Sequence, residues 1–88
     1  MFTGIIVDIG KITELRAIGA DRRIRVQTRL AADGLQLGGS IAVNGVCLTI
    51  ADLSAADFTA DVSAETLRCT TFGGLQLDDP LNLEPALR

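Results

Sequence analysis

The chain has 88 residues, of which 48% are hydrophobic and 22% charged, and its formal net charge is −3. This length corresponds to one small domain, and the composition is that of a folded globule, which excludes a disordered segment. Nucleic-acid binding needs a basic face and often uses stacking aromatic side chains. The negative charge and the presence of only three aromatic residues, all phenylalanine, therefore argue against a nucleic-acid partner.

Metal chemistry and membrane insertion are not indicated by the sequence. The chain has no histidine, and its two cysteines, Cys47 and Cys69, are too far apart for a zinc site or a CxxC redox site. The first residues, MFTGIIVDIG, contain neither a basic leader nor a long apolar segment, so we expect no signal peptide and no transmembrane helix. A cytoplasmic location with reduced thiols is the resulting expectation.

The first part of the chain has the pattern of two strands joined by a hairpin loop at residues 19–22. Residues 3–18 are rich in Ile, Val and Thr, and the apolar phase shifts after Gly10, which indicates a bulge or a sharp bend. Residues 23–30 alternate, and their arginines indicate a solvated outer face rather than a nucleic-acid patch. The inward set is Ile24, Val26, Thr28 and Leu30, and the outward set is Arg23, Arg25, Gln27 and Arg29.

The rest of the chain predicts a loop over residues 31–39, whose Leu35 and Leu37 plug one end of the core, and four further strands. Two of these, residues 40–44 and 46–53, flank Asn44-Gly45, the strongest short hairpin signal, because both turn residues tolerate positive φ. A strand over 57–63, a short helix over 63–68 that Ser63 can cap, a loop over 72–80 and a last strand over 81–83 follow. Six short strands predict an all-β fold, a small antiparallel barrel in a single domain of residues 1–88.

Cys47 and Thr49 lie on the same side of the fourth strand, and the local sequence leaves two interpretations of that side open. Free cysteine is commonly a small hydrophobe in a barrel wall, and no neighbouring base indicates a thiolate. A threonine inside the barrel would need a hydrogen-bond partner, whereas in a cleft a ligand can supply one. The pair is therefore either core filling or one wall of a binding site.

Residues 61–66, DVSAET, mark the point where a strand leaves for a helical turn. Free backbone N–H groups at such a start can bind polar edges of a ligand. The alternative is a capped turn with solvated acids. Near the N-terminus, Gly4 either permits close approach of a flat ligand or is an edge-strand residue.

Four segments in order give the chain a resemblance to a known family. They are MFTGII at the start, SIAVNGVCLTI in the middle, DVSAETLRCT after it and LNLEPALR at the end. Together they resemble the N-terminal one of the two tandem lumazine-binding barrels of the riboflavin synthase family, over residues 1–88. The resemblance implies a six-stranded antiparallel Greek-key barrel with one short helix. It also implies an enzyme that converts two molecules of 6,7-dimethyl-8-ribityllumazine into riboflavin and 5-amino-6-ribitylamino-uracil, without a metal or redox cofactor.

The resemblance also assigns roles to residues. It implies that lumazine and riboflavin contact three segments, with Phe2 in a positioning role and with Cys47 and Ser40 as candidate catalytic residues. The substrate-binding residues that it implies are Gly4, Ile5, Ile6, Cys47, Leu48, Thr49, Asp61, Val62, Ser63, Ala64, Glu65 and Thr66.

Members of this family are longer than this chain, because a second barrel follows, and each active site lies between barrels of two different subunits. The resemblance therefore implies that the single barrel binds ligand well and catalyses weakly or not at all. It also implies a homodimer of lone barrels where full-length members form homotrimers. The alternative is a non-catalytic lumazine- or flavin-binding module of the antenna type.

Overall fold

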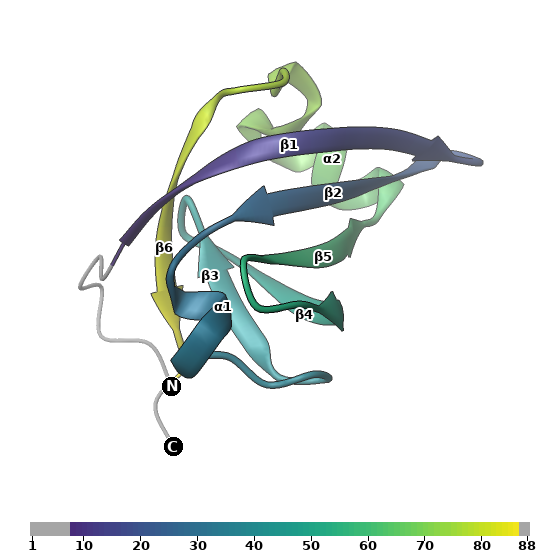
Figure 1. The fold of residues 1–88 in the computed structure, drawn as a ribbon. Coiled ribbons are helices and arrows are strands. Elements are labelled where there is room, and N and C mark those ends of the chain that lie inside the picture. Colours follow the sequence, from purple (N-terminus) through teal and green to yellow (C-terminus); the bar gives the residue numbers. More distant parts are fainter. Residues whose placement is uncertain (1–7, 87–88) are drawn as a thin grey trace.

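In the computed structural model, which describes residues 8–86, six antiparallel strands close into a barrel (Figure 1). Around the barrel the strands follow the order β1-β2-β5-β4-β3-β6, so β2 and β3 are consecutive in the chain but are not neighbours. This Greek-key order confirms the predicted fold. The elements are β1 (Asp8–Ile18), β2 (Asp21–Gln27), α1 (Leu30–Asp33), β3 (Ser40–Val43), β4 (Val46–Leu53), β5 (Asp57–Val62), α2 (Ala64–Cys69), η1 (Thr71–Gly74) and β6 (Pro80–Pro85).

The hydrophobic core fills the inside of the barrel, because side chains alternate between the two faces of each strand. The alternation predicted for β2 is confirmed: Ile24, Val26 and Thr28 are buried, whereas Arg25 and Arg29 are exposed. The buried cluster consists of Ile12, Ile24, Val26, Ile41, Val43, Leu48, Ile50, Phe58, Ala60, Val62, Phe72, Leu81 and Leu83.

The β3–β4 hairpin has the turn that its sequence predicts. Asn44 and Gly45 have φ angles of 50° and 83°, both in the left-handed region that a two-residue type I′ turn requires. The turn is also tied to β6, since the Asn44 side-chain oxygen accepts from the Asn82 N–H at 2.8 Å and the Asn44 N–H donates to the Asn82 carbonyl at 2.8 Å. These contacts hold the hairpin, and hence β4, in a fixed register against the rest of the barrel.

β1 closes the barrel by pairing with two different strands. Its residues 8–11 pair with β6, and its residues 11–18 pair with β2. The bulge predicted after Gly10 is present, but it lies between Ile12 and Glu14, where β1 turns fully onto β2. Gly10 itself serves close packing, because a Cβ there would lie 2.6 Å from Val26 Cγ1 and 2.8 Å from Leu83 Cδ1.

Two predicted loops contain helical turns, and one predicted core residue is outside the core. α1 begins at Leu30, where the Thr28 hydroxyl oxygen accepts from the Leu30 N–H at 3.1 Å, so β2 ends at Gln27 and Leu30 packs on the core from α1. η1 interrupts the predicted loop over 72–80. Leu35 packs against the core as expected, but the prediction for Leu37 is wrong, since it is 66% exposed.

α2 confirms the predicted short helix, and it lies beside η1 and β2, behind β1 and β2 in Figure 1. No helix within residues 8–86 has the length and apolar character needed to cross a membrane.

Candidate functional site

Cys47 and Thr49 lie on the outer face of β4, and both are exposed. Between them Leu48 points into the core, where it is 6% exposed, because neighbouring residues of a strand face opposite ways. The interpretation of Cys47 and Thr49 as core filling is therefore wrong. The thiol and the hydroxyl are presented to solvent, as a binding surface requires.

The register of β3 and β6 extends this outer surface across three strands. Ser40 pairs with Thr49, and Ala42 pairs with both Cys47 and Glu84. Glu84 is only 8% exposed although it faces outward. Glu84 was not among the residues predicted from the sequence. The alternation along β6 could have identified it as an outward-facing residue, since Leu81 and Leu83 of that strand face the core.

Residues 61–66 span the junction of β5 and α2, with Ser63 between the two elements, and we call them the β5–α2 connection. Ser63 is the N-cap, and its hydroxyl oxygen accepts from the Thr66 N–H at 3.2 Å. The predicted capping is thus confirmed. Asp61 and Glu65 are exposed, whereas the Val62 side chain lies in the core, so only the backbone of Val62 is available at the surface.

The register of β4 and β5 brings these two surfaces to one end of the barrel. Ile50 pairs with Ala60 in antiparallel orientation. The residues before Ile50, which include Cys47 and Thr49, therefore run toward the residues that follow Ala60. By this register, the β4 outer face and residues 61–66 lie at the same end of the β4–β5 pair, and we call them together the β4–α2 surface (Cys47, Thr49 and residues 61–66). Four further predicted site residues, Phe2, Gly4, Ile5 and Ile6, lie outside the described residues.

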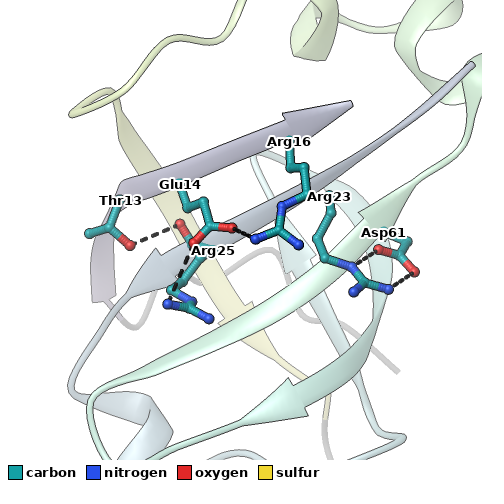
Figure 2. A network of polar contacts seen from close by, with 6 residues as sticks. All are labelled: Thr13, Glu14, Arg16, Arg23, Arg25 and Asp61. Carbon is teal, nitrogen blue, oxygen red and sulfur yellow. Dashed lines mark hydrogen bonds and ion pairs between the residues drawn. The ribbon is translucent and has the colours of Figure 1, made fainter. Parts of the chain in front are cut away.

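The arginines predicted for the outer face of β2 are paired with carboxylates (Figure 2). Arg23 donates to Asp61 through Nε at 2.7 Å and Nη2 at 3.1 Å. Arg25 and Arg16 both reach Glu14, at 3.5 Å and 2.8 Å. The positive charges on this face are thus balanced by neighbouring acids, which agrees with a solvated face rather than a nucleic-acid patch.

Two carboxyl groups of the barrel have altered acidity. The hydroxyl of Thr28 donates to Asp8 at 2.6 Å and lowers the pKa of that carboxyl, and Arg29 acts in the same direction. The hydrogen bonds from Arg23 lower the pKa of Asp61. Both groups are therefore easier to ionise in the folded protein than in the unfolded chain.

These two carboxylates should make the barrel sensitive to acid. Because each pKa is lower in the folded state, each group contributes stability that is complete above the unfolded value of about 3.9 and is lost as the pH falls through the folded-state pKa. We expect the urea midpoint to drop between pH 5 and about pH 3, and to drop less in an Asp8→Asn, Asp61→Asn double variant. An equal drop in both proteins would contradict the role of these groups.

Residues 3–86 match the lumazine binding domain family. Among curated proteins, the chain is 44% identical over 87 residues to riboflavin synthase of Actinobacillus pleuropneumoniae, covering 99% of this chain and 40% of that protein. It is 38% identical to riboflavin synthase of Bacillus subtilis (strain 168), with the same coverage. The chain thus spans about two fifths of the length of these relatives.

Solved structures show the same barrel with ligands. LumP complexed with 6,7-dimethyl-8-(1'-D-ribityl) lumazine superposes with a TM-score of 0.89 at 25% identity, covering 100% of this chain and 49% of that one. LumP complexed with riboflavin superposes with a TM-score of 0.88 at 26% identity, covering 97% of this chain and 46% of that one. The family match over nearly the whole chain and these superpositions agree, and the chain belongs to the lumazine-binding domain family.

Proposed function

We propose that this chain is the N-terminal barrel of a riboflavin synthase and that it binds 6,7-dimethyl-8-ribityllumazine and riboflavin at the β4–α2 surface. The observation that carries the proposal is the position of Cys47 and Thr49. They are exposed at the same end of the β4–β5 pair as residues 61–66. The identity to two riboflavin synthases, 38% and 44%, supports the same assignment.

The residues of this surface suit a pteridine. The edge of that ring system carries alternating N–H and C=O groups, which hydroxyls and backbone groups can recognise. Thr49 offers an exposed hydroxyl on a rigid strand, and residues 61–66 offer hydroxyls and a strand end. The surface can thus fix the orientation of a flat ligand through its polar edge.

For catalysis, the barrel would supply half of a site. One lumazine gives a four-carbon unit to the other, so the acceptor becomes riboflavin and the donor becomes 5-amino-6-ribitylamino-uracil. The main requirement is to hold the two rings in contact, which is a proximity effect. One barrel holds one ring, and a second barrel of the complete enzyme holds the other. Cys47 and Ser40 are the candidate groups for nucleophile addition or proton transfer, and Phe2 is the candidate positioning residue.

Titration with riboflavin tests the binding proposal. We expect quenching of riboflavin fluorescence by the barrel with a dissociation constant of tens of micromolar or lower, equivalent to about −6 kcal/mol or stronger. Absence of quenching in this range would contradict ligand binding at any part of the chain.

The second candidate function is a non-catalytic lumazine- or flavin-binding module. The LumP superpositions favour it, since LumP, which is complexed with ribityllumazine and riboflavin in those structures, contains a barrel of the same fold. A single-turnover assay with the lumazine, with and without a C-terminal barrel supplied in trans, separates the two candidates. Riboflavin formation only in the presence of the second barrel supports the synthase half, and none in either case supports the binding module.

Self-association and location are further parts of the proposal. The chain exposes large apolar side chains, among them Ile9 at 63% and Leu77 at 58%, which a second barrel can cover. We infer a symmetric homodimer of the lone barrel and a cytoplasmic location. Equilibrium sedimentation at high micromolar concentration tests the dimer, and a monomer under those conditions would contradict it.

Replacement of the exposed thiol should have a small effect. For Cys47→Ser we expect a folded protein whose affinity for riboflavin changes by less than about fivefold, or about 1 kcal/mol, because serine is close to cysteine in size and can still donate and accept a hydrogen bond. Riboflavin titration measures this. Cys69→Ser is the matched control, since Cys69 is also exposed and lies at the end of α2. Complete loss of binding in Cys47→Ser alone would make the thiol an essential ligand contact.

A further inference from the structure

The first residues of β2 contact the β5–α2 connection from the side. The carboxylate of Asp21 accepts from the N–H of Ala64, the first residue of α2, at 2.9 Å. The guanidinium of Arg23 donates two hydrogen bonds to Asp61, near the end of β5 (Figure 2). Two residues of one strand therefore reach both sides of the connection.

The strand register explains how β2 can do this. Arg23 pairs directly with Asp61, and Arg22 pairs with Val62, the last residue of β5. Asp21 is one residue further and thus lies beyond the end of β5, opposite the start of α2. Since Asp21 and Arg23 are two residues apart in a strand, both side chains project from the same outer face.

These contacts differ in kind from those within the connection. The Ser63 cap joins residues three apart, so it shapes the turn but does not fix its position on the barrel. The bonds of Asp21 and Arg23 span 43 and 38 residues of sequence, and they tie the connection to the neighbouring strand β2 of the closed barrel. α2 has only six residues, and a helix of that length depends on tertiary contacts for its order.

We propose that Asp21 and Arg23 are positioning residues for the ligand. They hold residues 61–66 at a fixed distance from Cys47 and Thr49, without contacting the ligand themselves. This inference rests on the proposed function of the β4–α2 surface. A preformed surface spares the ligand the cost of ordering it, so loss of either contact should weaken binding and speed dissociation.

The test compares Asp21→Ala and Arg23→Ala with two reference variants. Arg25→Ala is the matched control, because Arg25 projects from the same strand face but pairs with Glu14 and not with the connection. Asp21→Asn is the conservative variant, because its amide oxygen can still accept from Ala64. For each protein we would measure the riboflavin dissociation constant and dissociation rate, the urea midpoint, and hydrogen exchange at the Ala64 amide.

We expect the affinity for riboflavin to fall by more than any change in stability explains. Asp21→Ala and Arg23→Ala should bind riboflavin about two- to tenfold more weakly than Arg25→Ala, with faster dissociation. The urea midpoint of Asp21→Ala should match that of Arg25→Ala. That of Arg23→Ala should be slightly lower, because its ion pair with Asp61 is lost, but its loss of affinity should exceed what the change in midpoint explains. Asp21→Ala should also speed exchange at the Ala64 amide, and Asp21→Asn should restore most of the affinity and protection.

Four outcomes would count against the proposals. If the wild-type barrel does not bind riboflavin, the proposed function fails, and this inference fails with it. If the wild type binds riboflavin and both alanine variants bind it as Arg25→Ala does, only this inference fails. It fails likewise if the affinity for riboflavin follows the urea midpoint across all variants. If an alanine variant does not fold, Arg23→Lys replaces it as the test. Lysine keeps the positive charge but cannot donate the two parallel hydrogen bonds that the guanidinium of Arg23 gives to Asp61. Weaker binding at unchanged stability then supports the inference, and unchanged binding overturns it.

Discussion

Gly10→Val should destabilise the barrel by about 3 kcal/mol or more, the upper end of what overpacking costs. A Cβ at this position would lie 2.6 Å from Val26 Cγ1, 2.8 Å from Leu83 Cδ1 and 3.1 Å from the Gln27 carbonyl oxygen. The leucine methyl can move, but Val26 is fully buried with a stiff β-branched side chain, and the carbonyl belongs to the backbone of β2. β1 would have to separate from its neighbours at the place where the barrel closes.

Urea unfolding measures this effect, and a graded series makes the cause identifiable. Gly10→Ala should cost about 1–3 kcal/mol, less than valine, because only the Cβ must be accommodated. Gly74→Ala is the matched control, since nothing lies within 4 Å of a Cβ built there. Equal stability of Gly10→Ala and Gly74→Ala would show that β1 can shift to accept a side chain.

Thr49→Val should weaken riboflavin binding by about 1–3 kcal/mol, or roughly five- to 150-fold, while stability changes by less than about 0.5 kcal/mol. The hydroxyl is exposed on the outer face, so its removal leaves no buried partner unsatisfied in the free protein. Valine keeps the shape of threonine and its preference for strands. The loss appears only when a ligand polar group meets a methyl group instead of the hydroxyl.

Titration of Thr49→Val with riboflavin, together with its urea midpoint, tests this expectation. Thr13→Val is the matched control, because Thr13 is an exposed threonine on β1, where its hydroxyl donates to the Arg25 carbonyl at 3.4 Å. That variant should bind riboflavin as the wild type does. Binding of Thr49→Val at wild-type affinity would remove Thr49 from the site.

Features of the fold that depend on short-range signals could be predicted from the sequence. Asn44-Gly45 defines its turn through backbone preferences of two adjacent residues, and the alternation from Ile24 to Thr28 defines which face of β2 is buried. The cap at Ser63 is likewise local. The outward direction of Cys47 and Thr49 needed the structure, because alternation shows that two side chains share a face without showing which face is inside.

Features that depend on register between distant strands could not be predicted. The bonds from Asp21 to Ala64 and from Arg23 to Asp61 exist because β2 pairs with β5 and extends beyond its end. The residues themselves appeared as part of a charged hairpin. The bulge was predicted after Gly10 from a shift in the apolar phase, yet it lies between Ile12 and Glu14, just past Lys11, where β1 passes from β6 to β2. Its place is set by the geometry of closure rather than by the glycine.

The double pairing of β1 also has a consequence for the order of folding. Asp8 pairs with Leu83, so closure joins segments from nearly opposite ends of the described chain. Contacts of such long sequence separation form slowly, because the loop must close before the pairing stabilises it. During synthesis, β1 and β2 can pair early, but the free edge of β1 stays uncovered until β6 has left the ribosome. Until then that edge is open to strands of other nascent chains, and β6, the last strand of this barrel, is the one that protects β1.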